Sequence, residues 1–139
     1  MSDPFRHSFR VRYAEVDPQS VVFNSRYLEY ADVVVTEFFI DLRAQGKAID
    51  SEFHVRHAEI DFLAPIRLEE MIEGRLTIER IGNSSLEKKI TLHGAEDGSL
   101  RATISLVTVH VDLSTGQSMP IPDHIREAFG FPALEKAHG

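Results

Sequence analysis

Asp17 is a candidate catalytic residue, because it lies in an expected turn seven residues before an apolar segment with helical spacing. Pro18 follows it and disfavours helical backbone at Asp17, which keeps this carboxylate outside regular helix. A positioned carboxylate can act as a general base or as a nucleophile. An aspartate in a turn can equally serve only to hydrogen-bond the neighbouring backbone.

The segment from about residue 25 to residue 45 is expected to be a long helix, with Asn24 or Ser25 as its N-cap and Gly46 just beyond its end. The first N–H groups of a helix have no partner within it and carry partial positive charge, so they could stabilise an oxyanion near Asn24. Apolar residues spread beyond one face of this helix, which predicts that it is covered on several sides.

Alternation of apolar and polar residues predicts the strands. The expected strands are residues 5–13, 54–63, 71–81, a segment beginning at 86, and 100–113. Within the last of these, the apolar parity changes after Leu106, which predicts either a bulge or a strand covered on both faces near its end. A short helix is expected after Pro122.

The expected fold class is therefore α+β, an antiparallel five-stranded sheet wrapped around a long central helix. At 139 residues, with no linker or repeat, the chain is expected to form one domain over residues 1–139. Such a sheet has open edges, and pairing with a second copy is a natural way to cover them. We therefore expect a homodimer or a homotetramer.

Composition excludes several classes of function. The chain has no cysteine, which excludes disulfides, a thiol nucleophile and thiolate metal sites. Its formal net charge of -7 disfavours nonspecific binding to nucleic acid. It has no apolar run long enough to span a membrane and no apolar core of a signal peptide near residue 1, so we expect a cytoplasmic protein with no membrane span.

The segment "RYAEVDPQSVVFNSRYLEYAD" (12–32) resembles the hotdog-fold acyl-CoA thioesterases of the 4-hydroxybenzoyl-CoA thioesterase type, which include the Tol-Pal-associated thioesterases. The stretches 58–70, 81–87 and 120–122 are also similar to that family, so the resemblance covers nearly the whole chain. One position departs from the pattern, because the family usually has Gly where this chain has Ser20. If that position requires a positive φ, Ser costs roughly 1 kcal/mol or more.

The resemblance implies hydrolysis of an acyl-CoA thioester to a free acid and coenzyme A, with no metal and no redox cofactor. It implies that Asp17 is the general base or the nucleophile and that the backbone N–H of Asn24 is the oxyanion donor. Tyr13 occupies a position at which relatives carry a tyrosine near the active site, and its hydroxyl could orient Asp17. The alternative for Tyr13 is a core aromatic residue at the end of a strand.

Two further features have both a functional and a structural interpretation. Lys88 and Lys89, near Arg75 and Arg80 in the sequence, form the best basic cluster for the phosphates of coenzyme A. Their alternative is ordinary solvated charge on a strand. Asp32 could hydrogen-bond a hydroxylated acyl group, or it could lie on the solvated surface of the helix.

Other activities stay open at this point. An acyl-carrier-protein thioesterase would need a local basic docking face, because such carriers are generally acidic and this chain has a net charge of -7. A noncatalytic acyl-binding hotdog dimer would use Asp17 only as a structural residue. Hotdog dehydratases normally need a catalytic histidine, and the Asp17 segment has none. His54 and His57 point to opposite faces of an expected strand, and no histidine has a spacing to carboxylates that predicts a metal site.

Overall fold

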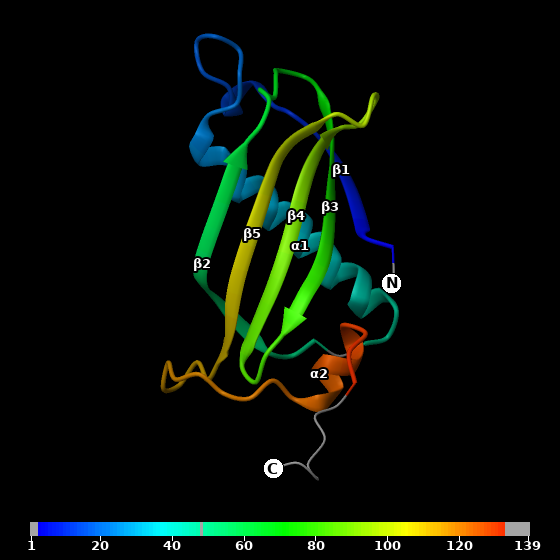
Figure 1. The fold of residues 1–139 in the computed structure, drawn as a ribbon, viewed down its shortest axis with the longest axis vertical. Coiled ribbons are helices and arrows are strands. Elements are labelled where there is room, and N and C mark those ends of the chain that lie inside the picture. Colours follow the sequence, from blue (N-terminus) through cyan, green and yellow to red (C-terminus); the bar gives the residue numbers. More distant parts are fainter. Residues whose placement is uncertain (1–2, 48, 133–139) are drawn as a thin grey trace.

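The computed structural model describes residues 3–47 and 49–132, and it confirms the α+β class. One antiparallel sheet has the strand order β1-β3-β4-β5-β2, and the long helix α1 (Tyr27–Ala44) lies across one of its faces (Figure 1). A 3-10 turn, η2 (Asn24–Arg26), leads into α1. The strands are β1 (Phe5–Arg10), β2 (Glu52–Phe62), β3 (Met71–Ile81), β4 (Ser85–Gly94) and β5 (Leu100–Val111).

The main core lies between α1 and the central strands. Ile72, Ile90 and Ile104 come from three adjacent strands and are wholly buried against Ala31 and Val34 of the helix. The helix lies very close to β3 at Gly74, where a Cβ atom would collide with a methyl group of Val34. This close approach fixes the position of α1 along the sheet.

The opposite side of α1 is open in the single chain, whereas the sequence predicted a helix covered on several sides. Val33 and Ile40 are exposed, although both are apolar.

In the part of the chain that the structure describes, no helix is both long and apolar enough to cross a membrane.

β1 is shorter than the expected strand over residues 5–13. Its ladder with β3 ends where Arg10 pairs with Met71, because β3 begins at that residue. The chain then continues into a 3-10 turn, η1 (Tyr13–Glu15). Alternation therefore predicted the strand but could not show where its partner ends.

The apolar parity changes within β5 because the strand is covered on both faces near its end, which was one of the two predicted explanations. Residues 108–111 are consecutively buried, so the end of β5 is covered on both faces. Ser118 forms a bridge with Val111, which brings the segment after β5 back against it. A register shift does occur in the β2–β5 ladder, on the β2 side between Val55 and His57.

A short second helix, α2 (Asp123–Ala128), follows Pro122 as predicted and packs beside the turn between β3 and β4 (Figure 1). Arg126 is wholly buried there and donates hydrogen bonds to the carbonyl groups of Gly82, Asn83 and Ile121. A guanidinium buried on carbonyl groups fixes α2 to this turn.

Candidate active site

Asp17 lies in a tight hairpin turn just before η2. Val16 and Val22 form an antiparallel bridge, and the N–H of Asp17 donates to the carbonyl of Val21 at 2.8 Å. The N–H of Ser20 returns to the carbonyl of Asp17 at 2.9 Å. Ser20 has φ 63°, so this position does require the left-handed conformation that favours glycine.

The side chain of Asp17 is half-buried and anchored through one of its oxygens. Its Oδ1 accepts hydrogen bonds from the N–H groups of Gln19, at 2.8 Å, and Val21, at 3.3 Å. Among residues 3–47 and 49–132, no group donates a hydrogen bond to Oδ2. Asp17 thus makes the local contacts of a turn aspartate, and its second oxygen stays available to a ligand or to water.

Asn24 is the first residue of η2, and its backbone N–H has no acceptor within the described residues. Its carbonyl accepts the N–H of Tyr27, as expected at the start of a helix. A cavity of about 230 Å³ opens beside it, and Val21, Tyr27 and Phe62 are among the residues that line this cavity. Asn24 thus borders this cavity, whereas Asp17, at the other end of the same short hairpin, is not among the residues that line it.

Tyr13 is 83% exposed in η1, so the alternative of a core aromatic residue at a strand end is wrong. The hydrogen bonds of the described residues include none between its hydroxyl group and Asp17. The structure thus places Tyr13 in the same loop as Asp17 but does not join the two side chains.

Glu15 is a buried carboxylate that the sequence pattern did not single out. It accepts hydrogen bonds from the Arg12 backbone at 2.8 Å, the Arg12 guanidinium at 2.9 Å and the Tyr30 hydroxyl at 3.0 Å. Burial alone would raise the pKa of the Glu15 carboxyl group, but the hydrogen bonds from Arg12 and Tyr30 hold this pKa below its usual value. Its carbonyl also accepts the N–H of Phe23 at 3.1 Å, so Glu15 fixes the Asp17 hairpin to α1.

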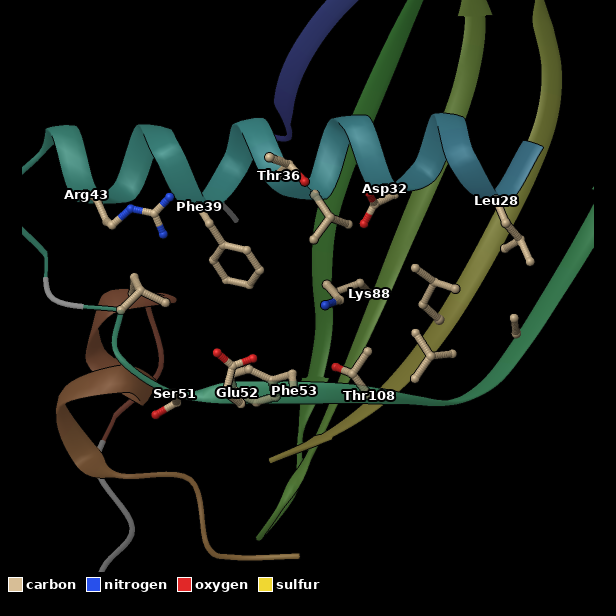
Figure 2. Close-up of a pocket in the computed structure, with 15 residues that line it drawn as sticks. Leu28, Asp32, Thr36, Phe39, Arg43, Ser51, Glu52, Phe53, Lys88 and Thr108 are labelled. Carbon is tan, nitrogen blue, oxygen red and sulfur yellow. The ribbon is translucent and has the colours of Figure 1, made fainter. Parts of the chain in front are cut away.

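A second and larger cavity of about 540 Å³, which we call the chamber, lies along α1 between Leu28 and Arg43 (Figure 2). It lies between α1, the first half of β2, and the inner face of β4 and β5. Its charged lining residues are Asp32, Arg43, Glu52 and Lys88. The apolar lining residues include Leu28, Val35, Phe39, Ile49, Phe53 and Leu106.

The two lysines expected to form one basic cluster point to opposite sides of the sheet. Lys88 lines the chamber and is 3% exposed, whereas Lys89 is exposed on the outer face. Arg75 and Arg80 pair with carboxylates, Arg75 with Glu73 at 2.6 Å. The structure therefore does not bring Lys88 together with the other three basic residues.

Asp32 is exposed, as its surface interpretation requires, and it also lines the chamber. Both interpretations therefore describe part of its position. Within the described part of the chain, no three histidine, aspartate or glutamate side chains are grouped as a metal site would need.

Comparison with known families decides the class. The model of the thioesterase-like superfamily matches residues 11–129, which include the hairpin, the chamber and the whole sheet apart from β1. The chain belongs to the thioesterase-like superfamily. Its five-stranded sheet around one long helix is the hotdog fold that the sequence predicted.

Named members of the superfamily align with parts of this chain. The acyl-CoA thioesterase YbgC of Helicobacter pylori (strain ATCC 700392 / 26695) is 29% identical over 72 residues, which cover 52% of this chain and 54% of that protein. The aligned part thus spans about half the length of this relative. The acyl-CoA thioester hydrolase YbgC of Escherichia coli O6:H1 is 28% identical over 106 residues, which cover 74% of this chain and 79% of that protein.

Solved structures of thioesterases share the fold. Slr0204, a 1,4-dihydroxy-2-naphthoyl-CoA thioesterase from Synechocystis, superposes with a TM-score of 0.80 at 20% identity and covers 91% of this chain and 96% of its own. A thioesterase from Thermus thermophilus, solved with coenzyme A and Zn, gives a TM-score of 0.77 at 26% identity and covers 92% of this chain and 98% of its own.

Proposed function

We propose that this chain hydrolyses the thioester bond of an acyl-CoA, and that the Asp17 hairpin and the start of η2 form its active site. One observation carries the proposal. Within the described residues, one hairpin holds at its two ends a carboxylate whose Oδ2 accepts no hydrogen bond, that of Asp17, and a backbone N–H that has no acceptor, that of Asn24. The relatives named acyl-CoA thioesterase and the neighbour solved with coenzyme A support the same activity.

Hydrolysis needs an activated oxygen nucleophile on one side of the thioester carbonyl. Oδ2 of Asp17 either removes a proton from water as the water attacks, or attacks the carbonyl carbon itself. In the first route the tetrahedral intermediate collapses, the C–S bond breaks, and the departing thiolate takes up the proton that Asp17 removed from water. Such general-base catalysis typically contributes about 10²–10⁴-fold in rate. In the second route the C–S bond breaks to leave a mixed anhydride on Asp17, and water hydrolyses this anhydride to the free acid and restores the carboxylate.

The carbonyl oxygen becomes an oxyanion in either route and needs a donor on its other side. The N–H of Asn24 fills this role in our proposal, because it stands at the positive end of a helix and has no acceptor among the described residues. The donor belongs to the backbone, so the identity of the side chain at residue 24 matters little.

The coenzyme A moiety would then remain outside the chamber. In our proposal Lys89 contacts the phosphates, and its exposure leaves its ammonium group accessible for this. Lys88 lies inside the chamber and is separated from that surface by the sheet. An acyl-carrier-protein thioester would present the same acyl group to the same site, so it belongs among the substrates tested.

We also infer that two copies associate through β2. This strand is an edge of the sheet, and apolar side chains along it stay exposed in one chain, with Val55 at 63%. Pairing of unprotected edge strands is a common route to dimers.

The test is the release of free coenzyme A from acetyl, medium-chain, long-chain and aromatic acyl-CoAs. Asp17→Asn should lower kcat by two or more orders of magnitude, since it removes the charge and keeps nearly the same shape. Asp97→Asn is a matched control, because Asp97 also accepts a backbone N–H in a turn, that of Ser99 at 2.9 Å. This control should keep kcat within about twofold of the unchanged protein.

An active protein that is indifferent to Asp17→Asn would contradict the proposed role of Asp17. Absence of turnover on every coenzyme A thioester, with turnover on acyl-carrier-protein thioesters, would move the substrate to the carrier protein. Retained acyl binding without any turnover would identify the chain as a noncatalytic acyl-binding protein.

A further inference from the structure

Lys88 is a buried ammonium group without a counter-ion in the described part of the chain. The residue is 3% exposed, and its Nζ atom makes neither a hydrogen bond nor an ion pair with any described residue. Its nearest notable contact is the ring of Phe39, whose centroid lies 5.6 Å from Nζ. Lysine is almost never fully buried unless it is paired, so this position calls for an explanation.

The Nζ atom of Lys88 faces the chamber. Among the described residues, every side-chain nitrogen or oxygen atom that is wholly enclosed has a hydrogen-bond partner. The Nζ atom of Lys88 has no partner, so it is not wholly enclosed and must border open space. Figure 2 shows Lys88 pointing into the chamber from the strands, with Asp32 and Phe39 of α1 above it. The ammonium group is therefore presented to whatever occupies this cavity.

None of the other charged residues of the chamber forms an ion pair with Lys88. Asp32 and Arg43 from α1 and Glu52 from β2 are all exposed, so water solvates them at the chamber rim. Burial lowers the pKa of Lys88 to about 8, and nearby Asp32 acts weakly in the opposite direction. At pH 7 the group is still protonated by about ten to one.

Part of the chamber is suited to a hydrocarbon chain. Leu28, Val35, Phe53 and Leu106 form this apolar part, and the hydroxyl side chains of Thr36, Ser51 and Thr108 line the chamber as well. A ligand that matches both features has an apolar body and one negatively charged oxygen group at the depth of Lys88. A buried charge is favourable only when it is paired in this way.

The distance from the proposed reaction centre sets the length of this ligand. Asp32, which faces Lys88, lies eight residues after Asn24, or about 12 Å along a helix axis at about 1.5 Å per residue. C–C bonds of about 1.5 Å advance a zigzag chain by about 1.3 Å per carbon, so about eight to ten carbons span this distance.

We propose that Lys88 binds a carboxylate at the far end of the acyl group, so that the chamber receives the acyl part of a dicarboxylic acid whose other carboxyl group forms the thioester. This inference rests on the proposed function for the placement of the thioester beside Asn24. It adds a substrate class, ω-carboxyacyl thioesters of medium length, and a residue that selects it.

The first experiment compares kcat/KM for matched coenzyme A thioesters of six, eight and ten carbons that end in a methyl, a hydroxyl or a carboxyl group. The unchanged protein should have a kcat/KM at least about tenfold higher for the carboxyl-ended thioester at one or more lengths. The reason is that the charged hydrogen bond between Lys88 and the carboxylate replaces the solvation that both groups lose in the chamber. Lys88→Met keeps the length of the side chain and removes its charge, so it should abolish or reverse this preference. Lys47→Met is the matched control, because Lys47 is an exposed lysine outside the chamber, and it should leave the preference unchanged.

Equal or better turnover of the methyl-ended or hydroxyl-ended series by the unchanged protein would overturn the proposal. The same carboxyl preference in Lys88→Met would overturn it as well. Either result leaves the thioesterase activity itself in place.

A binding measurement separates this inference from the proposed function. Titration calorimetry with S-(ω-carboxyalkyl)-coenzyme A and S-alkyl-coenzyme A thioethers, which cannot be hydrolysed, should show tighter binding of the carboxylated thioether and loss of that difference in Lys88→Met. This result without turnover of any thioester would support the Lys88 site while contradicting the hydrolase. Turnover of thioesters together with equal binding of both thioethers would support the hydrolase and contradict the Lys88 site.

Discussion

The backbone N–H of Asn24 can be removed by a proline substitution that is compatible with the local backbone conformation. Phe23, which precedes it, is extended with φ -59° and ψ 139°, a conformation compatible with a following proline. Proline is also favoured at the first position of a helix, where the N–H has no helical partner. Asn24→Pro should therefore fold normally and lower kcat by about 10²–10³, the usual loss for one oxyanion donor.

Asn24→Ala is the control, because it removes the side chain and keeps the N–H. It should stay within a few-fold of the unchanged protein in steady-state release of coenzyme A, and both variants should unfold at nearly the same temperature. A large loss in Asn24→Ala together with an active Asn24→Pro would show that the side chain, and not the backbone, is the donor.

Ser20 carries a backbone strain that glycine would relieve. Its φ of 63° is unfavourable for a residue with a Cβ atom. Ser20→Gly should raise the free energy of unfolding by about 0.5–1 kcal/mol, less whatever glycine gains in unfolded-chain entropy. Urea denaturation measures this difference, and Ser20→Ala, which keeps the Cβ atom, should show no gain. Greater stability of Ser20→Ala than of Ser20→Gly would contradict the strain.

At the scale of elements, the contact between Gly74 of β3 and Val34 of α1 fixes the helix on the sheet. A Cβ atom at residue 74 would overlap a methyl group of Val34, and overpacking of this kind typically costs about 1–3 kcal/mol. Gly74→Ala should therefore destabilise the fold. Val34→Ala opens space at the same point, so the double variant should be more stable than the sum of the two single effects predicts.

A double-mutant cycle by urea denaturation measures this coupling, which we expect to exceed about 0.5 kcal/mol. Gly74→Ala combined with Ile125→Ala is the comparison, because Ile125 belongs to a second apolar cluster, which includes α2. That pair should be additive. Additivity in both pairs would mean that the helix moves to accommodate the added methyl group.

The elements themselves were largely predictable, because alternation and helical spacing record which face is buried. β3 has the predicted bounds 71–81, and α1 differs from the expected helix by a residue or two at its ends. Lys88 shows what was missed. It has the same parity as Leu86 and Ile90, so the pattern already placed it on the inner face, whereas its neighbour Lys89 has the outer parity.

The candidate site was predictable only where the features that form it are local in the sequence. The Asp17 turn and the helix start follow from Pro18 and from the pattern of the hairpin. Glu15 was harder to find, because its burial depends on Tyr30, which is fifteen residues away. The i, i+3 spacing of Arg12 and Glu15 was the one local signal for that carboxylate. The chamber arises from four separate elements, and no single segment predicts it.

At the scale of the whole molecule, the two edges of the sheet differ. On β1 the inward-facing Phe5 and Phe9 are half-buried against the core. On β2 the apolar side chains are much more exposed, with Val55 at 63% and Phe62 at 48%. Water is thus left in contact with apolar side chains along an edge strand of 11 residues, which favours pairing through β2 over pairing through β1.

We therefore expect light scattering to give about twice the chain mass of 15.7 kDa. A charge on β2 should oppose this association, because it would be desolvated between two copies. Val55→Glu should weaken the dimer at least about tenfold in dissociation constant, an effect of about 1.4 kcal/mol or more. Leu113→Glu is the matched control, since Leu113 is 66% exposed and lies outside the strands.

A dimer that resists Val55→Glu but dissociates with Leu113→Glu would place the interface after β5 instead. A monomer at all concentrations would leave the β2 edge and the open side of the chamber facing water. Val55 and Ala58 also line the chamber, so a partner on β2 would close the cavity that holds Lys88. Hydrogen exchange of the β2 amides then provides an independent readout, because their protection should rise with protein concentration while that of β1 stays constant.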